Sequence, residues 1–105
     1  MKLVVKFGGT SLATVKDITN VAKTIDKIAK KNKTVVVCSA VDGITDELIE
    51  ISKLIERGKK KEANIMLAKI SQKHNQFATY LVKDSKTLKS LKSKINSDLK
   101  ELEEL

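Results

Sequence analysis

Residues 6–11, Lys-Phe-Gly-Gly-Thr-Ser, are the stretch around which the rest of the sequence is organised. They follow a short apolar strand at residues 3–5 and precede a segment with the apolar period of a helix. A strand that ends in small residues at a helix N-terminus leaves backbone N–H groups free and pointing in one direction, which suits a phosphate. The stretch is therefore a candidate phosphate site.

The segments that follow predict a βαβ unit. Apolar residues recur at intervals of three and four between Val15 and Ala29, which predicts a helix, and residues 34–38 form a second apolar strand. Strand, helix and strand in this order imply a right-handed crossover between parallel strands. The first strand is apolar on both faces, so we expect buried strands. Their carboxyl ends then share one sheet edge, where the glycine turn and the turn at residues 39–43 face a common crevice.

A further helix is expected after the second turn. Thr45 is its expected N-cap, and Ile44 and Ile49 are spaced as a hydrophobic staple across that cap. The helix is expected to run to about Arg57, because Gly58 is a natural C-terminal stop.

Two longer helices are predicted beyond this glycine. Apolar stripes run from Ala63 to Leu81 and from Leu88 to Leu102, with a break at residues 84–85. They predict a helical hairpin over residues 59–105. We therefore assign residues 1–105 to one α/β unit, with a βαβα part at 1–58 and a helical hairpin at 59–105.

Two features lead us to expect a truncated piece of a larger α/β enzyme. The last residues continue the apolar period and include no stop signal, so the helix ends only because the chain does. Two parallel strands are also too few for the usual covering of both sheet faces. The apolar stripes of the hairpin could pair with a second copy, so we expect a homo-oligomer.

The positive charge is unevenly spread along the chain. The net charge is +8, and residues 51–105 hold 13 basic and 7 acidic residues. Apart from the run Lys59–Lys61, these lysines stand singly between apolar positions of helical period, without an aromatic platform. This pattern favours a solvated helical face over a nucleic-acid surface. The N-terminal apolar run is too short for a signal peptide or a membrane span, and a single cysteine provides no disulfide. We expect a cytoplasmic protein that binds neither nucleic acid nor membrane.

Four other polar residues are expected to take no part in catalysis or metal binding. His74 lies on an apolar stripe without a Cys or His companion, so we interpret it as a satisfied core or interface histidine. Cys38, at the end of a strand, is interpreted as a small core residue. Asp46 is expected to stabilise a helix N-terminus, and neither Asp42 nor Asp46 is given a catalytic role.

The glycine turn fits neither common phosphate fingerprint. GxxxxGK[ST] requires a lysine after its glycines and GxGxxG requires three glycines, whereas here Lys6 precedes one Gly-Gly pair. A lysine near the end of an apolar strand is costly unless it reaches water or an anion. Lys6 therefore strengthens the phosphate interpretation.

Taken together, KFGGTS at residues 6–11 and SAVDGITD at residues 39–46 resemble the N-terminal part of the aspartate kinases. These enzymes have the three-layer αβα amino-acid kinase fold, and the resemblance implies that fold, ATP, Mg²⁺ and L-aspartate. It implies that Lys6 is catalytic, and it assigns no metal ligand. The residues it implies for ATP and phosphate are Lys6, Gly8, Gly9, Thr10 and Ser11, and those for aspartate are Ser39, Ala40 and Thr45.

The resemblance predicts an aspartate kinase, in which ATP phosphorylates the side-chain carboxylate of aspartate on the route to lysine, threonine and methionine. We expect residues 1–105 alone to be inactive. Two alternatives are another enzyme of the amino-acid kinase family and a basic helical binding module.

Overall fold

The computed structural model describes residues 1–105 and divides into two compact units, Met1–Thr45 and Asp46–Leu105. The boundary lies within the helix expected after the second turn, and most of that helix belongs to the second unit. Along the chain the elements are β1 (Lys2–Phe7), η1 (a 3-10 helix, Gly9–Leu12), α1 (Val15–Ala29), β2 (Lys33–Cys38), α2 (Ile44–Glu56), α3 (Lys60–Leu81) and α4 (Ser85–Glu104).

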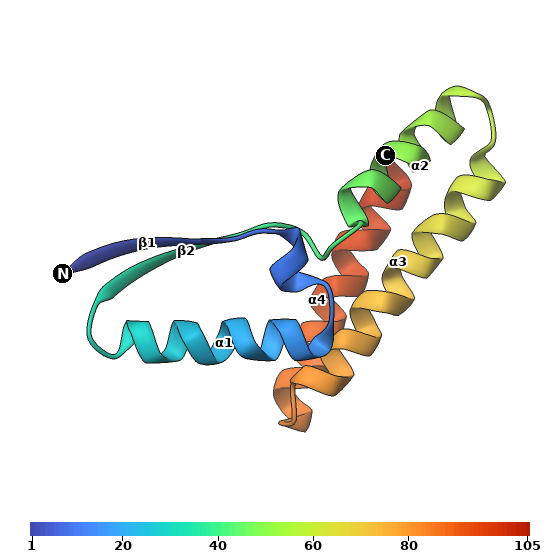
Figure 1. Cartoon of the computed structure of the whole chain (residues 1–105). Coiled ribbons are helices and arrows are strands. Elements are labelled where there is room, and N and C mark those ends of the chain that lie inside the picture. The colour runs from blue at the N-terminus through green and yellow to red at the C-terminus, as the bar shows by residue number, and fades with distance from the viewer. The chain divides into compact units, whose positions relative to one another are not determined.

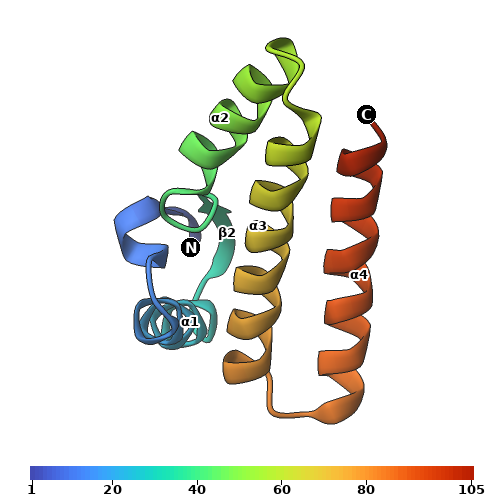
Figure 2. The same cartoon turned by 90° about the vertical axis from the view of Figure 1, so that its right-hand side faces the viewer.

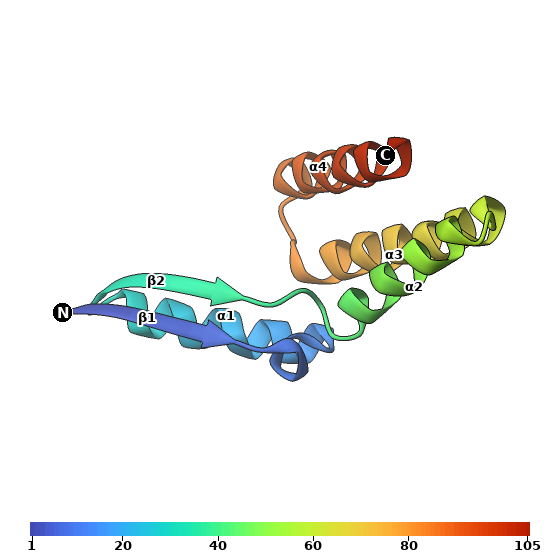
Figure 3. The same ribbon diagram turned by 90° about the horizontal axis from the view of Figure 1, so that it is seen from above.

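The two strands of the first unit pair in parallel, as the sequence predicted. Their register runs from Lys2 opposite Lys33 to Phe7 opposite Cys38, so both strands end at the same edge (Figure 3). The glycine turn and the second turn leave from this edge. The α/β expectation is confirmed for this part of the chain.

Only one face of this sheet is covered. α1 runs along β1 and β2 on one side (Figure 1), where residues at alternate positions of both strands are half-buried. On the other side Val4 is 73% and Val35 is 60% exposed. The expectation of buried strands is thus wrong here, because no element covers the second face. Cys38 is exposed as well, so its assignment to the core is also wrong.

The helix predicted over Val15–Ala29 is confirmed, but it does not begin directly at the glycines. η1 follows Gly8, and α1 starts at Val15, behind a capping box. In that box the backbone N–H of Asp17 donates to Thr14 Oγ1 at 3.1 Å, and the N–H of Thr14 donates to Asp17 Oδ2 at 3.2 Å. The N-terminus of α1 is therefore separated from the glycine turn by η1, and its N–H groups are not those of that turn.

α1 turns a slightly different face to the sheet than the stripe suggested. Val21 is buried, and Ile18, Ile25 and Ile28 are half-buried, whereas Ala22 and Ala29 are exposed. The larger side chains thus lie against the strands, as their greater apolar surface favours.

α2 starts at Ile44, two residues earlier than an N-cap at Thr45 implies, so Thr45 is not its N-cap but a residue of its first turn. The proposed staple is also absent, because Ile44 is only 4% exposed while Ile49 is 50% exposed. The end of the helix is confirmed. Gly58 has φ +74°, its N–H donates to Ile55 O at 3.0 Å, and the next N–H donates to Leu54 O at 2.8 Å. These bonds form a Schellman motif.

The predicted helical hairpin is present in the second unit. α3 and α4 run antiparallel beside each other (Figure 2). Asp84, in the predicted break, caps α4 by accepting a 2.8 Å hydrogen bond from the N–H of Thr87. The core residues of α3 are Ala63, Leu67, Ile70 and Ala78, whereas α4 has no buried residue. None of the helices combines the length and apolar character needed to cross a membrane.

Candidate functional site

The glycine turn presents backbone donors without partners. Gly8 has an extended conformation, with φ −84° and ψ 177°, and its carbonyl accepts the N–H of Ser11 at 3.1 Å. The N–H groups of Gly8, Gly9 and Thr10 make no backbone hydrogen bond. Successive N–H groups free in a turn form an anion-binding concavity. The donors predicted from the sequence are thus available, although they belong to a turn and η1 instead of an α-helix.

The second turn lies against the first. The N–H of Ser39 donates to Phe7 O at 3.0 Å, which continues the strand pairing by one residue. A Cβ on Gly9 would lie 3.1 Å from Asp42 Oδ1 and 3.9 Å from Ser39 Oγ. Gly9 therefore provides the space in which the second turn approaches, and the two motifs meet at one sheet edge.

Lys6 stands on the open face of the sheet. It alternates with the half-buried Val5 and Phe7 and is exposed, on the same side as Val4. Its neighbour on β2 is Val37. The charge thus reaches water without a burial cost, two residues before the glycine turn.

The remaining predicted site residues are less closely grouped. Thr10 is exposed, while Ser11 is half-buried and lines a hollow of about 220 Å³ between η1 and α1. Ala40 is exposed in the second turn, and Thr45 is exposed in the first turn of α2. The structure therefore brings together Gly9 and Ser39 most directly.

Asp42, to which the sequence analysis gave no catalytic role, is also a residue of this edge. Its carboxylate is the nearest group to Gly9 from the second turn, and the following Gly43 has φ +85°. An acidic residue before a glycine, in a turn at the shared edge of two parallel strands, is the signal that could have identified it.

His74 lies outside this arrangement. Its ring is half-buried, and its Nδ1–H donates to Ile70 O at 2.8 Å within its own helix, as the sequence suggested. No group of three or more His, Cys, Asp or Glu residues is arranged to hold a metal ion.

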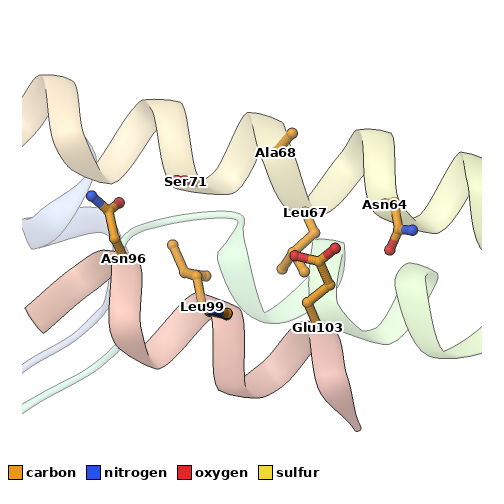
Figure 4. A pocket seen from close by; sticks show the side chains of 8 residues that line it. Asn64, Leu67, Ala68, Ser71, Asn96, Leu99 and Glu103 are labelled. Carbon is orange, nitrogen blue, oxygen red and sulfur yellow. The ribbon is translucent and has the colours of Figure 1, made fainter. Parts of the chain in front are cut away.

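A cavity between α3 and α4 is a second place where a site could lie. It measures about 480 Å³, and the side chains of Leu67 and Leu99 point into the space between the helices (Figure 4). Asn64, Asn96 and Glu103 are among its other lining residues. The cavity contains no residue of either motif, so we place the candidate site at the two turns.

Comparison with known proteins identifies the family of this chain. The sequence matches the amino acid kinase family over residues 1–101. The chain belongs to this family. Membership in a kinase family indicates a nucleotide as the phosphoryl donor.

Several curated members of the amino acid kinase family are similar to the chain. An aspartokinase of Geobacillus stearothermophilus is 40% identical over 68 residues, which cover 63% of this chain and 17% of the relative. An aspartokinase of Chlamydia pneumoniae is 40% identical over 82 residues, which cover 76% of this chain and 17% of the relative. Aspartokinase 2 of Bacillus subtilis (strain 168) is 41% identical over 68 residues, or 63% of this chain. The chain thus spans 17% of the length of these relatives.

Proposed function

We propose that this chain forms the part of an aspartate kinase that holds the transferred phosphoryl group and faces the aspartate acceptor. The reaction moves the γ-phosphoryl group of ATP to the side-chain carboxylate of L-aspartate. The contact of the glycine turn with the second turn, Gly9 against Ser39, is the observation that carries the proposal. The similarity to three aspartokinases supports it.

The first turn supplies the phosphate contacts. The free N–H groups of Gly8 and Gly9 donate to phosphate oxygens, and Lys6 offsets the charge of the phosphoryl group during transfer. Thr10, exposed beside these donors, and Ser11 line the same region. Lys6 is the catalytic residue of this proposal.

The second turn supplies the acceptor contacts. Ser39 and Ala40 follow β2 at the shared edge, and Thr45 opens α2. Their hydroxyl groups and backbone are suited to hold the polar groups of an amino acid. The aspartate carboxylate would then face the phosphoryl group held by the first turn.

The chemistry needs no general base. A carboxyl side chain with a pKa near 4 is already ionised at neutral pH, so the acceptor attacks without losing a proton. Catalysis reduces to alignment and to stabilising charge on the moving group. Mg²⁺ would accompany ATP in this proposal and would offset part of the charge on the phosphate groups. Asp42 is the carboxylate that approaches the glycine turn from the second turn.

Assembly and compartment belong to the same proposal. Leu91 and Leu102 of α4 are 37% and 40% exposed, and this uncovered apolar surface supports self-association of the protein. Sedimentation velocity of the chain over a range of concentrations tests it, and a monomer throughout would contradict it. The proposed reaction consumes ATP, which supports the expectation of a cytoplasmic protein.

A chimera tests the activity. Residues 1–101 of this chain would replace the corresponding N-terminal part of the Geobacillus stearothermophilus aspartokinase, and aspartyl phosphate would be trapped as its hydroxamate. We expect ATP-dependent product with aspartate as acceptor. Lys6→Ala should lower turnover by roughly 10²–10³-fold, because one charge-stabilising donor is removed from the transition state.

Lys2→Ala is the matched control, because Lys2 is also an exposed lysine of β1 on the same face as Lys6. It should leave turnover unchanged. If Lys6→Ala altered only the aspartate KM, its proposed role would be wrong. Product with another acceptor and none with aspartate would favour a different kinase of the family.

A further inference from the structure

α4 carries opposite charges on its two halves. Residues 85–95 hold four lysines and no acidic residue, which gives a net charge of +4. Residues 96–105 hold four acidic residues and one lysine, which gives a net charge of −3. The lysines of the first half are Lys86, Lys89, Lys92 and Lys94, and the acidic residues of the second half are Asp98, Glu101, Glu103 and Glu104. We call these segments the basic half and the acidic half of α4.

Most of these charges have no partner within the chain. Of the two ion pairs in the structure, only Lys94–Asp98 belongs to α4. The three glutamates of the acidic half and the other three lysines of the basic half form none. The helix dipole favours acidic residues in a first turn, and α1 and α2 have them there, whereas α4 has none beyond its cap Asp84. The division of charge therefore does not serve the stability of α4 itself.

An apolar edge of the same helix is also uncovered. α3 lies along one side of α4 (Figure 2), yet α4 has no buried residue. Leu91 is 37% and Leu102 is 40% exposed. They are eleven positions apart, which is about three helical turns, so they lie on the same side of α4. The hollow beside Leu91 is lined by residues of α4 alone, so no other element covers this edge there.

A second copy of this chain fits both features in one orientation. When two copies of α4 pair antiparallel about a two-fold axis, the basic half of each lies beside the acidic half of the other. The same axis brings Leu91 of each copy beside Leu102 of the other, because the interval between the two leucines is the same in both copies. A parallel pair would place like charges against each other, which costs free energy.

We propose that two copies of this chain associate through α4 in an antiparallel orientation. Leu91 and Leu102 lie between the two helices, and the basic and acidic halves face each other across the interface. This inference rests on the proposed function, because it gives a surface and an orientation to the self-association proposed there. The attraction between the halves offsets the repulsion between two chains that each carry a net charge of +8.

Sedimentation velocity of the full chain tests the pairing of the charges. The dissociation constant of the dimer should rise about tenfold or more between about 0.05 M and about 0.5 M NaCl, because salt screens exposed charges. Reversing three lysines of the basic half makes both halves acidic and should weaken association by about tenfold or more at low salt. These substitutions are Lys86→Glu, Lys89→Glu and Lys92→Glu.

A variant with both halves reversed is the matched control. It carries the three substitutions of the basic half together with three in the acidic half, so the halves again have opposite charges, in the reverse order. The added substitutions are Glu101→Lys, Glu103→Lys and Glu104→Lys. Association should recover in this variant. An unchanged helical signal in circular dichroism shows that both variants are folded.

Cross-linking tests the orientation. Leu91→Cys and Leu102→Cys are made separately, each with Cys38→Ser to remove the exposed native thiol. A disulfide requires Cα atoms within about 7 Å of each other, whereas two copies of residue 91 in an antiparallel pair lie about 16 Å apart along the helix axis. Under oxidation a mixture of the two variants should therefore form a covalent dimer, and neither variant should do so alone.

The outcomes separate this inference from the proposed function. A monomer at every concentration would overturn both the antiparallel pairing and the proposed self-association. Association that salt strengthens, or that reversal of the basic half does not weaken, would overturn the pairing and leave self-association in place. A covalent dimer of Leu91→Cys alone, or none in the mixture, would overturn the antiparallel orientation. The kinase activity of the chimera is measured independently of all these results.

Discussion

Residues 1–45 bury three side chains, whereas residues 46–105 bury five. The first unit, which contains both motifs, depends on strand pairing, a capping box and the close approach at Gly9. The second unit depends on apolar side chains along α3. The comparison shows that the part with the proposed chemistry is thinly packed. The stability of the first unit therefore depends on a few specific contacts. The stability of the second unit depends on the apolar side chains that recur along α3.

The largest expected effect is at the centre of the helical unit. Ile70 is 2% exposed, so Ile70→Ala should lower the free energy of unfolding by about 2–5 kcal/mol through lost burial and a residual cavity. Ile65→Ala is the matched control on the same helix, because Ile65 is 51% exposed, and should cost less than about 1 kcal/mol. Urea unfolding followed by circular dichroism measures both. Equal losses would show that the helical unit does not depend on its buried stripe.

A smaller effect is expected at the start of α1. Thr14→Ala removes the hydroxyl that accepts the N–H of Asp17 and should cost about 1 kcal/mol. Thr24→Ala, in the exposed middle of the same helix, should stay within about 0.5 kcal/mol, because alanine also favours the helix. Hydrogen exchange of the first-turn amides localises the change. Equal losses of unfolding free energy in Thr14→Ala and Thr24→Ala would contradict the role of the capping box.

The smallest effect concerns the N-cap of α4. The hydroxyl of Thr87, and then its backbone N–H, donate to Asp84 and hold the pKa of that carboxyl below its usual 3.8. A folded-state pKa below the unfolded value means that the stabilisation is complete above pH 3.8 and is lost as the pH falls through the folded-state pKa. A side-chain NMR titration should therefore give a midpoint below 3.8.

Thr87→Val is the test of that cause. Without the hydroxyl donor, the pKa of Asp84 should rise toward 3.8, while the backbone hydrogen bond keeps part of the depression. An unchanged midpoint would show that the backbone N–H alone lowers the pKa. The stability of α4 would then depend on pH through the backbone hydrogen bond of this cap alone.

Local patterns predicted the elements of both units. The apolar runs at β1 and β2, the period of α1 and the glycine after α2 each act over a few residues, so they can be read without knowledge of the fold. The parallel arrangement followed from the order of these elements. The stripes that end at Leu81 and begin at Leu88 located the hairpin in the same way.

The predictions that were wrong depend on what surrounds a residue in the fold, which a local sequence pattern does not specify. Cys38 and Val4 belong to apolar strands, yet their exposure depends on what covers the sheet. Thr45 has the chemistry of an N-cap, but the chain turns at Gly43, which has a positive φ, and enters the helix two residues earlier than that cap implies. Asp42 lies beside Gly9 only because two turns that are distant in the sequence approach each other, so its own neighbours in the sequence do not predict this position.

The open face of the sheet gives Lys6 a second importance. Exposed valines on a short, two-edged sheet are the surface through which strands of separate molecules stack and aggregate. Lys2 and Lys33 stand at one end of this face and Lys6 stands at the other, and such charges keep neighbouring sheets apart. Lys6, which we propose to contact the phosphoryl group, therefore also opposes aggregation through this face. We expect its replacement to lower the solubility of the protein as well as its activity.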